Sequence, residues 1–96
     1  MAYLNEQQRS QLRDDLKKLK FNQAKGRVRR MDPKARLVYV RNAQQVGRWL
    51  TRYDLEGLGT RVTLIEENRV VNDDQKLENE WQMVDVIVEP LPDNRN

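Results

Sequence analysis

The chain has 96 residues, which suits a single domain and is too short for two. Charged residues make up 34% and hydrophobic residues 38%, a polar balance that still lies outside the regime typical of disorder. The sequence contains no Cys and no His. It therefore has no disulfide, no thiolate nucleophile and no imidazole to act as a general base or metal ligand. We expect a non-catalytic protein without a cofactor or a small-molecule substrate.

The net charge of +3 conceals an asymmetry between the two halves. Residues 1–53 hold 14 Lys/Arg against 4 Asp/Glu, whereas residues 54–96 hold 4 against 11. Such a division is typical of a basic surface that meets an acidic partner, unless the two halves neutralise each other in the fold. No stretch reaches the ~20 apolar residues of a membrane span, and we expect no signal peptide and a cytoplasmic location.

The first predicted element is a helix at residues 5–20. Asn5 suits the N-cap and Gln8 follows three residues later, as in a capping box. Leu12, Leu16 and Leu19 recur at helical spacing and form one narrow apolar stripe. The stripe packs either on the rest of the protein or on a partner.

From Gly26 the pattern changes to that of strands, and we expect a β body at residues 26–90. Residues 27–31 and 36–43 flank Asp32-Pro33-Lys34-Ala35, a sequence that favours a turn and therefore a β-hairpin. Residues 44–55 fit either a strand, with Trp49, Thr51 and Tyr53 on one face, or a helix. Gly47 costs a helix about 1 kcal/mol relative to Ala, so we favour the strand.

The second half of the predicted body contains two further strands. Residues 60–65 form one, followed by a turn at 66–69 and a polar loop at 72–80. The other is Trp81 to Glu89, in which Val84, Val86 and Val88 share a face opposite Met83 and Ile87. We expect this strand to be buried on both faces except at Asp85, and a frayed tail at 91–96.

These elements predict one domain over residues 1–96 of the α+β class, mostly β. We expect the N-terminal helix to be followed by a five- to six-stranded antiparallel meander or small barrel, a layout like that of Sm-like, SH3-like or OB-type proteins. Layout alone does not determine function. The acidic residues late in the chain lack the ligand spacing of a calcium loop, so we expect no metal site.

The strongest functional signal is a basic run from Lys17 to Arg36, with nine Lys/Arg against one Asp. It predicts a surface that binds nucleic acid, RNA more than DNA, through five residues of the first hairpin: Lys25, Arg27, Arg29, Lys34 and Arg36. If residues 27–31 are a strand, Arg27 and Arg29 share a face and Arg30 points away toward a carboxylate.

An alternative function is equally compatible with the sequence. The chain would be a small assembly or regulatory subunit that docks on a larger, acidic protein through its helix and a strand edge. The partner-binding residues would then be Leu12, Leu16 and Leu19. The position of the aromatic side chains separates the two hypotheses, because bases stack on aromatic rings that lie among the arginines.

Overall fold

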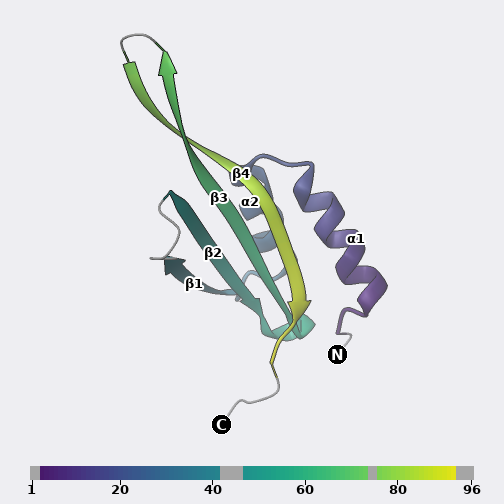
Figure 1. Cartoon of the computed structure of the whole chain (residues 1–96). Helices are drawn as coiled ribbons and strands as arrows, with labels where there is room; N and C mark the ends of the chain where they lie inside the picture. The colour runs from purple at the N-terminus through teal and green to yellow at the C-terminus, as the bar shows by residue number, and fades with distance from the viewer. Residues whose placement is uncertain (1–2, 42–46, 74–75, 93–96) are drawn as a thin grey trace.

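The computed structural model describes residues 3–41, 47–73 and 76–92. Two helices precede a four-stranded antiparallel sheet whose strands lie in chain order, β1-β2-β3-β4 (Figure 1). The α+β class with a majority of β structure is therefore confirmed. The strand order is that of the antiparallel meander that the sequence predicted as one of two alternatives. Within the described residues, however, the sheet has four strands rather than five or six, and it is open, so it is not a barrel.

Helix α1 spans Glu6–Lys17 and begins with the predicted capping box. The Asn5 side chain accepts a hydrogen bond from the Gln8 amide at 2.8 Å, and the Gln8 side chain accepts one from the Asn5 amide at 2.9 Å. The helix ends before residue 20 because Lys18 and Leu19 form a turn, closed by a bond from the Leu19 amide to the Leu16 carbonyl. Lys20 then becomes the N-cap of a second helix.

That second helix, α2, spans Phe21–Met31, where residues 27–31 were predicted as a strand. The prediction was wrong because Phe21, Ala24, Val28 and Met31 lie at helical spacing and bury that stripe against the sheet. This burial offsets the cost of Gly26 in the helix interior. The predicted turn is real but joins a helix to a strand. The Ala35 amide donates to the Asp32 carbonyl, and the Lys34 amide donates to the Asp32 side chain, both at 3.0 Å.

The four strands are β1 (Arg36–Arg41), β2 (Arg48–Leu55), β3 (Thr60–Asp73) and β4 (Lys76–Pro90). The strand predicted at residues 44–55 is thus confirmed over Arg48–Leu55, and residues 44–46 lie outside the described part of the chain. A short 3₁₀ helix, η1 (Glu56–Leu58), joins β2 to β3 and ends at Gly59. Gly59 has a positive φ of 57°, and an added Cβ would lie 2.8 Å from the ring of Tyr3. A glycine is therefore required there by backbone conformation and by close packing.

Strands β3 and β4 pair along their whole length and project beyond β1 and β2 as a two-stranded arm (Figure 1). The turn predicted at 66–69 and most of the loop predicted at 72–80 are therefore wrong, because strand pairing extends through both segments. Residues 74 and 75 lie outside the described part of the chain.

A β-bulge changes which residues of β4 face the helices. Ile65 is paired with Asp85 and the next residue, Glu66, with Met83, which leaves Val84 without a partner. As a result Met83 and Val88 pack against the core together with buried Val86, while Val84 and Ile87 are exposed. The predicted burial of this strand on both faces is wrong.

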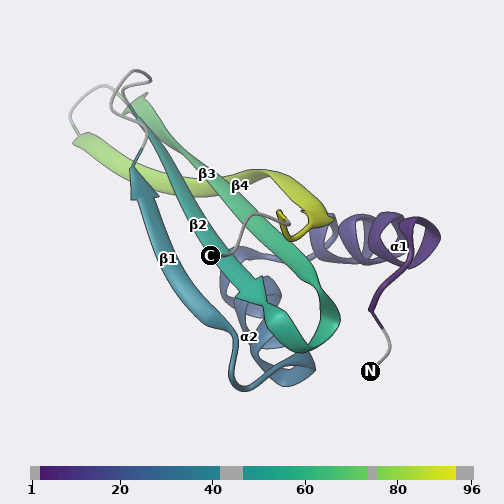
Figure 2. The same ribbon diagram turned by 90° about the horizontal axis from the view of Figure 1, so that it is seen from below.

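The core lies between the helices and one face of the sheet. It is formed by Leu12 and Leu16 of α1, Ala24 and Val28 of α2, and five residues of the sheet: Tyr53, Leu55, Val62, Leu64 and Val86. Helix α1 runs beside β4 and α2 lies behind the middle strands (Figures 1 and 2). No helix of the described residues lies on the opposite face. None of these helices has the length and apolar character needed to cross a membrane.

Candidate nucleic-acid interface

The predicted basic residues are divided by the fold rather than gathered on one hairpin. Arg27 and Arg29 lie on α2, where residues two apart are separated by about 200° around the helix axis. The predicted common face of these two residues is therefore wrong. Arg27 instead shares the outward side of α2 with Arg30, three residues later. Arg30 was expected to point away toward a carboxylate, but its Nε lies 3.4 Å from the Gly26 carbonyl oxygen.

The three arginines of α2 are available to a ligand. Arg27, Arg29 and Arg30 are all exposed, and α2 contains no acidic residue. The ion pairs of the described residues join Lys17 to Asp85, Arg48 to Glu67, and both Arg52 and Arg61 to Asp54. None of them involves α2. The partial neutralisation between the basic and acidic halves thus leaves the arginines of α2 unpaired within the described chain.

Two of the five predicted residues are separated from this surface. Lys25 is half-buried and lies close enough to the half-buried Glu66 carboxyl to oppose the rise in its pKa, which burial causes. Arg36 is exposed but begins β1 on the other face of the sheet, since its neighbour Leu37 packs against the core. Lys34 is exposed in the turn that follows α2. We therefore define the α2 basic face as Arg27, Arg30 and Lys34, whereas Arg29 lies on the opposite flank of α2.

Among the side chains that the structure describes, no aromatic ring lies between these arginines, and Phe21 of α2 packs against the core. Tyr53 is only 1% exposed and belongs to the core, and Trp49 is half-buried on β2. Trp81 is 46% exposed but lies on β4. The side chain of Tyr39 is outside the described residues. Ring stacking of unpaired bases therefore has no platform on the described part of the α2 basic face.

Trp81 instead borders a hollow between β4 and the corner that joins α1 to α2. The hollow has a volume of about 310 Å³ and is lined by Leu19, Lys20, Phe21, Trp81, Gln82 and Met83. Leu19 is the one member of the predicted partner-binding stripe that reaches this surface. Leu12 and Leu16 are 6% and 0% exposed and contact the sheet instead.

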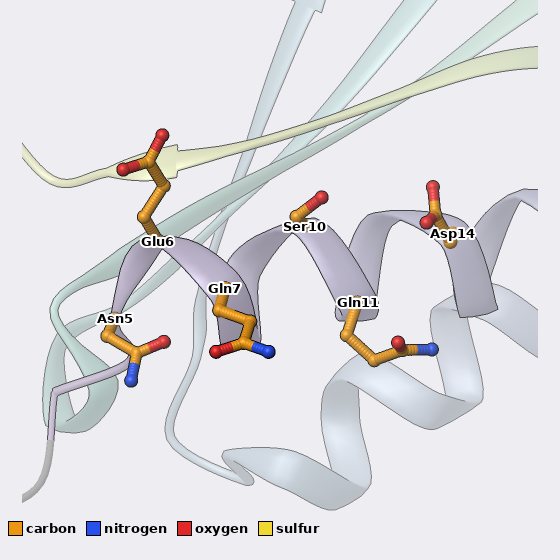
Figure 3. Close-up of a pocket in the computed structure, with 6 residues that line it drawn as sticks. All are labelled: Asn5, Glu6, Gln7, Ser10, Gln11 and Asp14. Atoms are coloured by element: carbon orange, nitrogen blue, oxygen red, sulfur yellow. The ribbon is translucent and has the colours of Figure 1, made fainter.

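A second hollow follows the polar flank of α1. Figure 3 shows Glu6, Ser10 and Asp14 projecting to one side of the helix and Gln7 and Gln11 to the other. Ser10 is exposed, as expected for the polar side of an amphipathic helix. Gln11 donates to Asp15 at 3.0 Å, an ordinary contact between residues one turn apart. The described residues contain no acidic cluster that could hold a metal ion.

Comparison of the chain with protein-family models, with curated proteins and with solved structures finds no significant match.

Proposed function

We propose that the protein is a non-catalytic, cytoplasmic module that binds nucleic acid through the α2 basic face. The observation that carries the proposal is that Arg27 and Arg30, both exposed and unpaired within the described chain, share one side of a helix without acidic residues. Phosphate groups are the ligands that such side chains prefer, and bidentate contacts from Arg to phosphate are among the stronger hydrogen bonds in proteins.

The geometry favours contact with the backbone of a duplex over binding of single strands. Affinity would come from phosphate contacts, because no aromatic ring among the described side chains is interleaved with the arginines. We place RNA before DNA because α2 is packed flat on the sheet through Ala24 and Val28. A helix held in this way cannot project deeply into the major groove of B-DNA, whereas the minor groove of an RNA duplex is wide and shallow.

A fluorescence anisotropy titration tests the proposal with a short RNA duplex, the matching single strand and the matching DNA duplex. Three phosphate contacts, from Arg27, Arg30 and Lys34, would weaken duplex binding about 40-fold between about 50 mM and about 200 mM salt, from a slope of ~0.9 per contact. The variant Arg27→Ala/Arg30→Ala leaves one contact and should show only about a fourfold dependence.

The matched control is Lys17→Ala/Arg48→Ala, which removes the same charge from side chains that already form ion pairs. It should bind as the wild type does. Absence of binding at low salt, or an equal loss in the control and in the α2 variant, would refute the proposal.

The exposed Trp81 favours a second candidate function, docking on a larger protein. An aromatic side chain that is 46% exposed beside an apolar hollow is typical of an interaction site, and Lys20 at its border suits an acidic partner. In that case Trp81→Ala removes a partner that co-purifies with the native protein, and Arg27→Ala/Arg30→Ala retains it. The opposite pattern supports the nucleic-acid function alone.

A further inference from the structure

On the face of the sheet opposite the helices, two rows of side chains are complementary to the same rows of a second copy of the chain. Since Leu37, Tyr53, Val62 and Val88 pack against the core, the residues next to them in each strand point to the other side. We call this other side the open face. Strand register arranges its residues in rows that cross all four strands.

The first row consists, from β1 to β4, of Arg36, Asp54, Arg61 and Glu89. Its charges alternate as plus, minus, plus, minus. Within the chain, the Arg61 Nε donates to the Asp54 carboxylate at 2.8 Å, which raises the pKa of Arg61. The two outer members, Arg36 and Glu89, lie on opposite edges of the sheet and are both exposed.

The second row consists of Val38, Arg52, Thr63 and Ile87. Its outer members are apolar and its inner members are polar. The two rows surround a depression of about 180 Å³ lined by Leu50, Arg52, Arg61, Thr63, Ile87 and Glu89. Ile87 is 40% exposed at its border. An apolar area among paired charges, with charged residues at the margin, has the composition of a protein interface.

If a second copy is related to the first by a twofold axis parallel to the strands, each row lies over the same row of that copy. Two identical sheets stacked face to face about this axis place β4 of one copy over β1 of the other, and β3 over β2. Arg36 then meets Glu89 of the second copy, and Asp54 meets its Arg61. In the next row Val38 meets Ile87 and Arg52 meets Thr63. Every charge in the first row meets the opposite charge, and the apolar residues of the second row meet each other.

The dimensions of the face agree with a dimer of modest affinity. Eight residues along each of β2, β3 and β4 and the six residues of β1 cover roughly 470 Å² in projection for each copy, at ~3.3 Å per residue and ~4.8 Å per strand. Two copies therefore bury about 1,000 Å², the lower limit of specific interfaces. Sheets that pack face to face lie ~10 Å apart with their strands within about 30°, which the long arginine side chains can span.

We propose that the open face is the interface of a homodimer with a twofold axis parallel to the strands. The complementarity of the two rows carries this inference. It is independent of nucleic-acid binding, because the α2 basic face lies on the other side of the sheet.

The test is sedimentation equilibrium of the whole chain from about 1 µM to about 500 µM. The apparent mass should rise from 11.5 kDa toward twice that value. In Glu89→Arg, the new arginine of each copy faces Arg36 of the other copy. The two like-charged contacts should weaken association about tenfold or more. The double reversal Arg36→Glu/Glu89→Arg restores opposite charges between copies and should restore the dimer.

Restoration of the dimer by the double reversal would show that residues 36 and 89 contact each other between copies. Residues 36 and 89 are separated by three strand spacings, about 14 Å, in one chain and have no direct contact there. Ile87→Asp provides a second disruption at an exposed site that the single chain tolerates, and Arg27→Glu on α2 serves as a control that keeps the dimer. Circular dichroism verifies that each variant folds. A wild type of constant mass, or a double reversal that dimerises no better than Glu89→Arg, would overturn the proposal.

Discussion

The two faces of the sheet consist of alternate residues of the same strands, yet they differ in composition and in what stabilises them. Beneath the helices Leu55, Val62 and Leu64 are fully buried, and Tyr53 is 1% exposed. On the open face arginines alternate with carboxylates and with single apolar residues. The comparison shows that one face stabilises this chain by excluding water, whereas the other is held together by pairing charges.

The covered face should show the largest effect of a single substitution. Leu16 of α1 is 0% exposed, so Leu16→Ala should lower the free energy of unfolding by about 2–4 kcal/mol. Ile87→Ala on the open face is the matched comparison, and should cost less than about 1 kcal/mol because the side chain is already 40% exposed. Urea denaturation of dilute protein measures both. If both substitutions lowered the free energy of unfolding equally, burial of apolar side chains would not distinguish the covered face from the open face.

On the open face, the largest effect is expected at Asp54, whose carboxylate pairs with both Arg61 and Arg52. Its side chain is 15% exposed, which limits screening by solvent. Asp54→Ala leaves two partly buried guanidinium groups without their carboxylate, and should cost about 1–2 kcal/mol. The cost should shrink in high salt, unlike that of Leu16→Ala. A loss independent of salt would contradict the role assigned to charge pairing.

The sequence predicted those parts of the fold that depend on local patterns. The capping box of α1, the Asp32 turn and the strand at residues 48–55 all follow from neighbouring residues. The prediction was wrong at α2. The apolar stripe from Phe21 to Met31 is interrupted in the sequence by Gly26 and the arginines, which favoured a strand at residues 27–31. The prediction was also wrong at the arm. There the polar residues of β3 and β4 form strands because the two segments pair with each other along one long hairpin.

The candidate site was predicted by residue type but not by arrangement. Charge density alone selected Arg27 and Arg29 as candidates, and Arg30 was placed on the side away from Arg27 because residues 27–31 were predicted as a strand rather than a helix. The complementary rows of the open face were missed because they depend on strand register. Register is determined jointly by four strands, which include the bulge between Ile65 and Glu66, and no single segment contains it.

A stabilising substitution is expected on the covered face at Thr51, which is 1% exposed. Its hydroxyl oxygen has no hydrogen-bond partner among the described residues. A buried hydroxyl without a partner costs free energy, so Thr51→Val should raise the free energy of unfolding by about 1 kcal/mol. Thermal denaturation checks this expectation. A decrease would show that the hydroxyl is satisfied in solution.

The smallest effect concerns Glu66, at the margin of the covered face where the arm begins. Burial raises the pKa of its carboxyl above the usual 4.5, and nearby Lys25 opposes the rise. Because the pKa is higher in the folded chain than in the unfolded one, the folded chain binds the proton more tightly. Ionisation above this pKa therefore lowers stability, and protonation below 4.5 removes the penalty.

Glu66→Gln, which stays neutral, should be more stable than the wild type at pH 7 by about 0.5 kcal/mol or less, since the group is only partly buried. The difference should shrink as the pH falls below 4.5 and vanish near pH 3, where the wild-type carboxyl is protonated in both states. Exposed Glu67, one residue along β3 and paired with Arg48, is the matched control. Glu67→Gln should give no gain at pH 7. If both substitutions gave the same gain, general charge reduction rather than burial would explain it.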